Sequence, residues 1–268
     1  MGSKISTCIR IDSLKNDNYE PSSKDSSTLN KNKKLLDLSK SPKTEDTGST
    51  ETTISNRSLS DIREAIDQIF ILCETGVAST IQFIINAYPE IESLINERHS
   101  CHVSDIEMEL TPLQLSAACG HSHVVELLLS CTNININLQE KQYMMTAIHL
   151  AVALGQSNIT EILCKDSRIN LNVKNIDGKT ALHLAIELED VNSVEMITRL
   201  KPNLDLRKKD FDGNTALHYC SYYPNEKIMR ILVNHAMSLN YYYPCQATSP
   251  RGFIDRSQAK RLFYSVTL

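Results

Sequence analysis

The stretch GKTALHLA, residues Gly178–Ala185, recurs with small changes along the 268-residue chain. Its threonine returns at four positions, Thr111, Thr146, Thr180 and Thr215, so the offsets are 35, 34 and 35 residues. A nearly constant period of this length indicates units that stack on one another, because one such unit alone cannot bury its apolar face. We therefore expect the middle of the chain to be a repeat structure.

Each unit predicts two helices and a turn. A short helix follows the threonine, and a second, longer apolar run such as Ile159–Cys164 forms another helix after a break. The breaks fall at Gly120, Gly155, Asp190 and Pro224. An Asn-rich extended piece then leads to the next unit, where Gly178 and Gly213 supply the positive φ that a tight turn requires.

These units resemble the ankyrin-repeat family, whose T-P-L-H-x-A signature at a 33-residue period is close to Thr180–Ala185. The resemblance covers roughly Thr111–Asn240. It implies an all-α fold, an ankyrin-repeat solenoid of helical hairpins with β-turn tips. It also implies a non-enzymatic protein-binding adaptor or regulator in signal transduction, with its partner on the concave helix face and the turn tips.

Four regions are expected along the chain. Residues 1–58 contain many Ser and Thr and few apolar residues, so we predict a disordered N-terminal tail. Residues 59–110 are predicted to be a degenerate N-terminal repeat followed by a loop over Asn96–Leu110. Residues 111–243 hold four ankyrin repeats, and residues 244–268 are expected to form a partial C-terminal capping repeat.

The repeated histidines suggest a metal ion or a general base, but their spacing argues against both. Equivalent positions in stacked hairpins lie roughly 8–10 Å apart, whereas metal–nitrogen bonds are about 2 Å long. The ankyrin pattern instead implies a structural His that hydrogen-bonds near the preceding Thr. Gln114 takes this place in the first clear unit, and an amide keeps the hydrogen bonding without the acid–base chemistry. We expect no metal site.

No catalytic motif is present. The sequence has no Gly-x-Ser-x-Gly elbow, no Gly-rich phosphate loop and no His-Glu-x-x-His. Most of the chain is already assigned to repeats, which leaves little for an active site. We predict no catalytic residues and no cofactor.

The interaction surface is predicted from the resemblance, because each inner helix of such a stack exposes the two residues before the break. These predicted partner-binding residues are Ala118, Cys119, Ala153, Leu154, Glu187, Leu188, Tyr222 and Tyr223. The turn tips beside them add Tyr143, Ile176, Lys208 and Phe211. Apolar and aromatic groups with Arg or Lys are favoured at protein interfaces. The alternative is that neighbouring turns cover the leucines and water solvates the Lys.

The N-terminal tail carries candidate modification sites. Its start, MGSKIS, fits the N-myristoylation pattern at Gly2, and Cys8 is available for palmitoylation as a second anchor. Ser41, before Pro42, suits a proline-directed kinase, and Thr47 lies in a segment with a faint similarity to the phosphodegron of inhibitors of NF-kappa-B. One alternative reading is therefore a soluble regulator of a transcription factor that is controlled by phosphorylation of this tail.

The composition limits the classes of partner and the cellular compartment that we expect. The net charge of −4 gives no reason to expect nucleic-acid binding. The eight cysteines form no C-x-x-C pair and indicate free thiols in a reducing compartment. We expect a monomeric, cytoplasmic protein with a protein partner, at a membrane surface if acylated, and leave the nucleus open. A further alternative is a fragment of a larger ankyrin-containing enzyme, for instance a phospholipase or an ArfGAP.

Overall fold

The computed structural model describes residues 59–103, 106–201 and 204–238. The chain divides into two units, residues 1–58 and 59–268, and all described residues belong to the second. The predicted disordered tail and the predicted capping repeat over 244–268 both lie outside the described residues.

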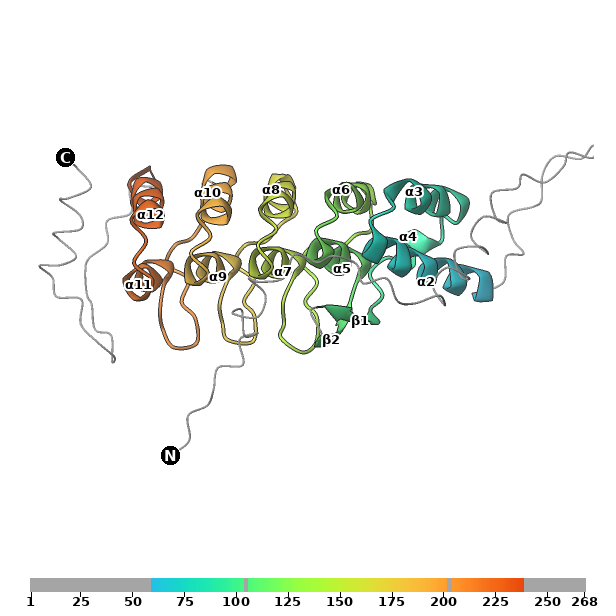
Figure 1. Cartoon of the computed structure of the whole chain (residues 1–268), viewed down its shortest axis with the longest axis horizontal. Coiled ribbons are helices and arrows are strands. Elements are labelled where there is room, and N and C mark those ends of the chain that lie inside the picture. Colours follow the sequence, from blue (N-terminus) through green and yellow to red (C-terminus); the bar gives the residue numbers. More distant parts are fainter. Residues whose placement is uncertain (1–58, 104–105, 202–203, 239–268) are drawn as a thin grey trace, which may run out of the picture. The chain divides into compact units, whose positions relative to one another are not determined.

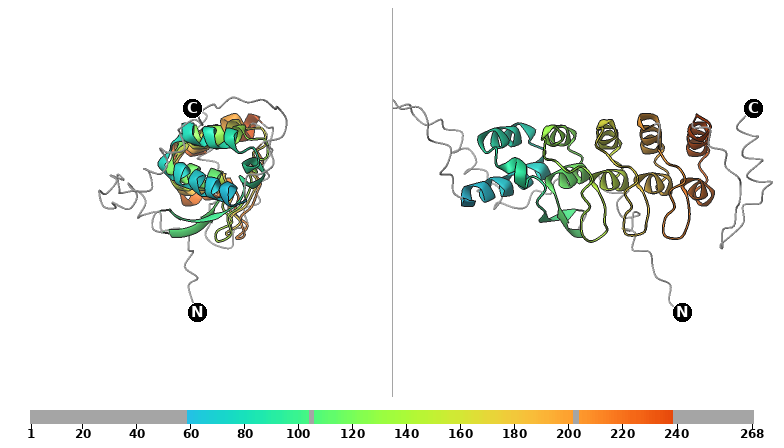
Figure 2. Two further views of the ribbon diagram at one scale, coloured as in Figure 1. Left: turned by 90° about the vertical axis from the view of Figure 1, so that its right-hand side faces the viewer. Right: turned by 180° about the vertical axis from the view of Figure 1, so that it is seen from behind.

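Helical hairpins form a single row in the described part of the chain (Figure 1). The inner helices are α2 (Leu59–Thr75), α5 (Pro112–Cys119), α7 (Ala147–Ala153), α9 (Ala181–Glu187) and α11 (Ala216–Tyr222). The outer helices are α3 (Ala78–Ala87), α6 (Ser122–Ser130), α8 (Ser157–Lys165), α10 (Val191–Leu200) and α12 (Glu226–Ser238). Extended loops leave the inner row on the side away from the outer helices, as the rotated views in Figure 2 also show. The expected solenoid of helical hairpins is confirmed.

Local signals in the sequence explain where the inner helices begin and end. Thr111 is the N-cap of α5, and its hydroxyl accepts a hydrogen bond from the backbone N–H of Gln114 at 3.3 Å. Pro112 occupies the first helical position, where no backbone donor is needed. Gly120 ends the helix with φ of 84°, a left-handed conformation that side chains with a Cβ rarely adopt.

The core lies between the two rows of helices and between successive hairpins. Leu113, Leu150, Leu128 and Ile159 are at most 1% exposed. Burying one such side chain completely contributes roughly 1.5–3 kcal/mol. The stack is therefore stabilised mainly by apolar contacts that each hairpin makes with its neighbours.

A β-hairpin stands where a loop was expected over Asn96–Leu110. Strand β1 (His99–Val103) pairs antiparallel with β2 (Ile106–Leu110), with His99 opposite Leu110. Strand β2 alternates, because Met108 and Leu110 are buried whereas Glu107 and Glu109 are exposed. This hairpin occupies the side of the molecule where the later loops also extend (Figure 1). A short helix, α4 (Ile91–Leu94), precedes it.

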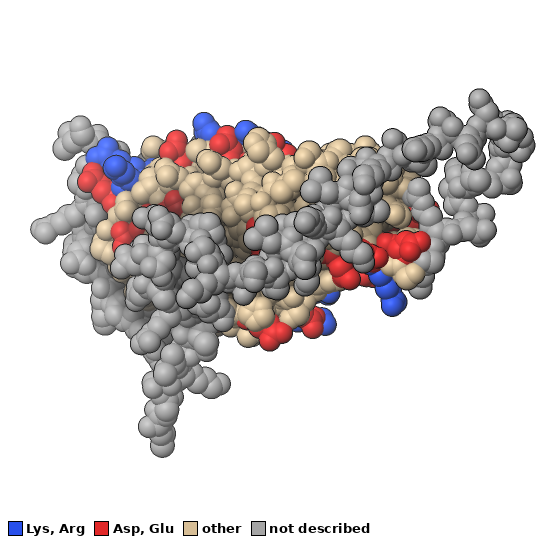
Figure 3. Space-filling view, turned by 45° about the vertical axis from the view of Figure 1, so that its right-hand side comes forward, with Lys and Arg blue, Asp and Glu red and all other residues tan. Residues whose placement is uncertain are grey.

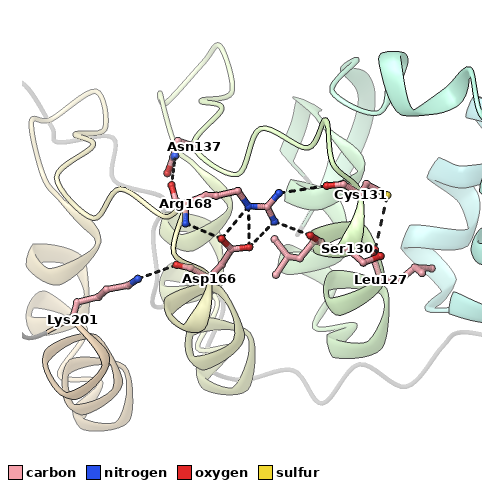
Figure 4. Close-up of polar contacts among 8 residues, drawn as sticks. Leu127, Ser130, Cys131, Asn137, Asp166, Arg168 and Lys201 are labelled. Atoms are coloured by element: carbon pink, nitrogen blue, oxygen red, sulfur yellow. Dashed lines mark hydrogen bonds and ion pairs between the residues drawn. The ribbon is translucent and has the colours of Figure 1, made fainter.

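Polar side chains tie the outer helices together across the repeats (Figure 4). The guanidinium of Arg168, just after α8, donates to the carbonyl of Leu129 at 2.7 Å and to that of Cys131 at 3.4 Å, at the end of α6. Lys201, after α10, donates in the same way to the carbonyl of Asp166 at 2.9 Å. The last carbonyls of a helix have no partner within the helix, and cations are favoured there. Each basic residue therefore completes the helix of the preceding repeat.

Candidate interaction surface

The repeated histidines are structural caps, as the sequence predicts. The backbone N–H of Thr146 donates to Nδ1 of His149 at 3.3 Å, and the Thr146 hydroxyl lies 2.8 Å from the same nitrogen. The pairs Thr180–His183 and Thr215–His218 repeat this arrangement. Because Nδ1 accepts from a backbone N–H, the neutral ring carries its proton on Nε2.

Burial keeps these imidazoles uncharged at neutral pH. Desolvation lowers the pKa of His149 from its usual 6.5 to about 4. Desolvation also lowers the pKa of His183 to about 4, although the nearby Asp210 acts in the opposite direction. The Nε2 of His149 lies 3.3 Å from the carbonyl of Lys179, which belongs to the next turn. His149 therefore joins its own helix to the following loop, whereas the buried Nε2 of His183 has no hydrogen-bond partner among the described residues.

Gln114 performs the same task in the first of these units. The backbone N–H of Thr111 donates to its side-chain oxygen at 2.9 Å. Its side-chain nitrogen donates to the carbonyls of Leu138 at 2.8 Å and Met145 at 3.2 Å. The amide thus replaces the imidazole in both contacts, which is the exchange that the sequence predicts.

The turn tips are residues Glu140–Met145, Asn175–Lys179 and Asp210–Asn214, each closed by its first residue. The Asn175 side chain accepts from the backbone N–H groups of Asp177 at 3.0 Å and Lys179 at 2.8 Å. Glu140 accepts from three backbone N–H groups in the first tip, which is one residue longer. These side chains replace hydrogen bonds that short turns cannot make by themselves. The tips are accordingly built to a common design.

Consecutive tips are joined to one another by the backbone. The N–H of Ile176 donates to the carbonyl of Tyr143 at 2.9 Å, and the N–H of Phe211 donates to that of Asp177 at 3.2 Å. An added Cβ on Gly178 would lie 2.6 Å from the backbone nitrogen of Phe211. The three tips therefore form one continuous edge.

Large apolar side chains stand out from this edge. Met144, Ile176 and Phe211, which we call the tip row, are 44%, 48% and 71% exposed. The ammonium of Lys174 lies 5.8 Å from the centre of the Phe211 ring. Tyr143 and Lys208, also predicted as contacts, are half-buried. Exposed apolar groups in a row, rather than scattered, are typical of an interaction surface.

The predicted strip on the inner helices is less uniform than the tip row. Ala118 and Ala153 are buried, whereas Cys119, Leu154 and Leu188 are half-buried. Tyr222 is 49% exposed. The structure thus leaves the predicted concave residues with very different access to solvent.

Glu187 takes part in a contact within the protein. Its carboxylate lies 2.7 Å from the ammonium of Lys179, and both side chains are largely covered. The hydroxyl of Tyr223 donates to the same carboxylate at 3.4 Å. In the adjacent turn, the Tyr219 hydroxyl donates to Asp210 at 2.8 Å. These contacts connect the inner helices to the turn tips, so Glu187 has a structural role within the surface.

Sequence reasoning missed Met144, which lies at the position of Gly178 and Gly213 in the other tips. Its φ is 55°, close to the 76° and 85° of those glycines. A non-glycine residue in this region is uncommon and strained. The available signal was a bulky residue two positions before the repeated threonine, where later units have glycine.

The predicted modification sites Gly2, Cys8, Ser41 and Thr47 lie outside the described residues. Within the described part, no group of three or more His, Cys, Asp or Glu side chains is arranged to hold a metal ion. Nor does any helix there combine the length and apolarity needed to cross a membrane.

Stacked hairpins with Thr-x-x-His caps and projecting turns define a repeat solenoid. The family model for ankyrin repeats in three copies matches residues 73–175 and 167–242, which together span more than half of the chain. The chain therefore belongs to the ankyrin-repeat family, which is a protein-interaction module. The match begins within α2, so the first part of that helix lies outside it. No curated protein matches the chain.

Proposed function

We propose that this chain is a non-enzymatic adaptor that holds a protein partner on the tip row and the adjoining concave face. The observation that carries the proposal is the exposure of Met144, Ile176 and Phe211 on three consecutive tips that are linked through the backbone. A partner that covers all three side chains removes their exposed apolar surface from water. At roughly 25 cal/mol per Å² of apolar surface, such burial favours association.

The surroundings of the tip row suit the rim of an interface. Lys174 places a cation 5.8 Å from the centre of the Phe211 ring, and Asp177 and Asp212 place anions on the same tips. Charges around an apolar centre contribute mainly to the choice and orientation of the partner. On the concave side, Tyr222 offers an exposed ring next to Tyr223, whose hydroxyl is held by Glu187. Tyr222 is therefore the inner-helix residue best placed to extend the contact.

The proposal is tested by affinity purification and mass spectrometry with the full chain in its native cell. We expect Ile176→Glu combined with Phe211→Glu to lose partners that the wild type recovers, because the carboxylates would be buried in the interface. His123→Glu combined with Asn192→Glu, two exposed positions on outer helices α6 and α10, is the matched control and should keep them. Equal recovery by the tip variant and the wild type would reject the tip row.

The adaptor is also proposed to be tethered to a membrane through Gly2, with Cys8 as the second signal. Metabolic labelling with an alkyne myristate analogue should mark the wild type and leave Gly2→Ala unlabelled. Absence of label on the native N-terminus would remove the tether and favour a soluble regulator instead.

A further inference from the structure

The first hairpin exposes an apolar side chain where every later described hairpin buries one. Ile71 lies five residues before the break at Gly76, and it is 41% exposed. The residues at the same position, five before Gly120, Gly155, Glu189 and Pro224, are Leu115, Leu150, Leu184 and Tyr219. Glu189, with φ of 53°, takes the place of the glycine in its unit. None of these four is more than 6% exposed.

The exposure of Ile71 shows which way this position faces. Helix α2 packs against its own outer helix α3 and against the next inner helix α5, as the later inner helices do with their neighbours. What α2 lacks, within the described residues, is an inner helix before it. In the last unit this position is Tyr219, whose ring lies 5.1 Å from that of His183 in the preceding hairpin. The position of Ile71 therefore faces the side of a preceding hairpin, and the described residues leave that side of α2 uncovered.

Two further residues of the first hairpin belong to the same face. Phe83, seven residues after the break, is 62% exposed, whereas its counterparts Leu127, Ile162, Met196 and Ile231 are half-buried. Val77, directly after the break, is also exposed. Its counterpart His121 places Nε2 2.9 Å from the carbonyl of Glu74 in the hairpin before it. The residue at the position of Val77 in the next repeat thus contacts the preceding hairpin. We call Ile71, Val77 and Phe83 the end face.

Acidic side chains surround the end face. Glu64 lies seven residues before Ile71 on α2, so it shares the same side of the helix, and it is exposed. Glu74, three residues after Ile71, is also exposed and lies at the edge of this side nearer to β1 and α5, because its charge helps to raise the pKa of Cys101 and Cys119. Residues 59–97 contain seven Asp and Glu and only one basic residue, Arg63, which gives 1 − 7 = −6. Acidic side chains gather on the surface at the α2 end of the stack (Figure 3).

We propose that the end face binds an amphipathic helix of another protein, with an apolar stripe and basic flanks. The apolar stripe would cover Ile71, Val77 and Phe83, as an outer or inner helix covers these positions in the later repeats. The basic flanks would lie against Glu64 and Glu74. Helix recognition by a few apolar anchors at helical spacing is a common mode of binding, and charge complementarity selects the partner.

A second copy of this chain fits the end face poorly. A symmetric dimer would place the same patch of both copies together, and so would bring Glu64 and Glu74 of each near those of the other. Like charges at an interface oppose association. Stable dimers also bury about 800 Å² per partner, and three partly exposed side chains offer little toward that area.

The test is a titration of the full chain with two fluorescent peptides, followed by anisotropy. One probe is an amphipathic helix of leucines on one face and lysines on the other, and the second replaces every lysine by glutamate. We expect binding of the lysine probe only. Phe83→Gln should weaken it at least tenfold, whereas Phe211→Gln, the same change in the tip row, should not. Glu64→Lys with Glu74→Lys should weaken binding and reduce its salt dependence.

A control variant tests whether the overall negative charge alone attracts the probe. Glu126→Lys with Glu195→Lys changes two exposed acidic residues on later outer helices and should leave binding unchanged. Equal loss from both charge pairs, or no effect of Phe83→Gln in a protein with unchanged circular dichroism, would overturn the proposal. Concentration-dependent dimers in sedimentation velocity that Phe83→Gln abolishes, without probe binding, would also overturn it in favour of a second copy. Because the tip row is tested separately, by partner recovery with Ile176→Glu and Phe211→Glu, failure here leaves the proposed function intact.

Discussion

The first hairpin and the later hairpins differ in the residues at the positions where the later inner helices begin. In the later units a threonine begins the inner helix, and a His or Gln three residues on closes the cap. In the first unit Asp67 and Phe70 occupy those positions, and α2 runs through them for 17 residues. Phe70 instead stacks on His99 of β1, with ring centroids 4.1 Å apart. The cap therefore occurs where the chain enters the inner helix from an extended segment, which is strand β2 before α5 and a turn tip before α7, α9 and α11.

The two regions should differ most in their sensitivity to truncated apolar side chains. Leu150→Ala should lower the free energy of unfolding by about 2–5 kcal/mol, because Leu150 is 1% exposed and a cavity would remain. Ile71→Ala at the equivalent place on α2 should cost about 1 kcal/mol or less, because its side chain is partly in water. Urea denaturation followed by circular dichroism measures both. Equal losses would show that the end face is covered in solution.

A second difference is the response to acid, because the neutral cap histidines belong to the later units. His149 and His183 have a folded-state pKa of about 4 and an unfolded-state value near 6.5. Between these values the unfolded chain binds more protons, so stability is present above pH 6.5 and falls as the pH drops toward 4. Urea midpoints across this range should decrease. His149→Gln, which copies Gln114, should reduce the slope, and an unchanged slope would argue against buried neutral rings.

Substitution of two turn glycines with positive φ distinguishes the cost of backbone strain from the cost of a steric clash. Gly178→Ala should destabilise by more than the roughly 1 kcal/mol that a left-handed Ala costs, because the new methyl meets the backbone of Phe211. Gly213→Ala has nothing within 4 Å of its Cβ and should show only the smaller cost. Thermal unfolding of both variants gives the comparison. The reverse order would mean that the tips are not joined as described.

The smallest effect concerns the strained residue of the tip row. Met144→Gly should raise stability by up to about 1 kcal/mol, because glycine accepts φ of 55° without strain. The same change should weaken partner recovery, because an exposed apolar side chain is lost. Greater stability with undiminished recovery would remove Met144 from the interaction surface.

Much of the fold follows from short-range patterns, and the exceptions have physical causes. The threonine period and the Thr-x-x-His spacing predict the stack and its caps, because both act within one helical turn. The β1–β2 hairpin was missed although Ile106–Leu110 alternates apolar and acidic residues, which favours a strand. The repeat pattern had suggested a loop there. The resemblance to ankyrin repeats predicted the turns but did not predict that a β-hairpin takes the place of a loop here.

The surface was harder to predict because access to solvent depends on neighbours distant in sequence. Glu187 was expected to face a partner, yet Lys179 reaches it from the preceding turn. Ala118 and Ala153, also expected to face a partner, are buried. Ile71 is exposed because no described hairpin precedes α2, and the residues of α2 alone do not predict this exposure. Ile176 and Phe211 were found because turn tips extend beyond the packed helices.

Hydrogen–deuterium exchange of the full chain with its recovered partner tests the central claim most directly. We predict slower exchange on binding in Glu140–Met145, Asn175–Lys179 and Asp210–Asn214, the three turn tips, with little change in outer helices α8 and α10. Protection confined to the outer helices, with unchanged exchange at the tips, would contradict the claim that the tip row holds the partner.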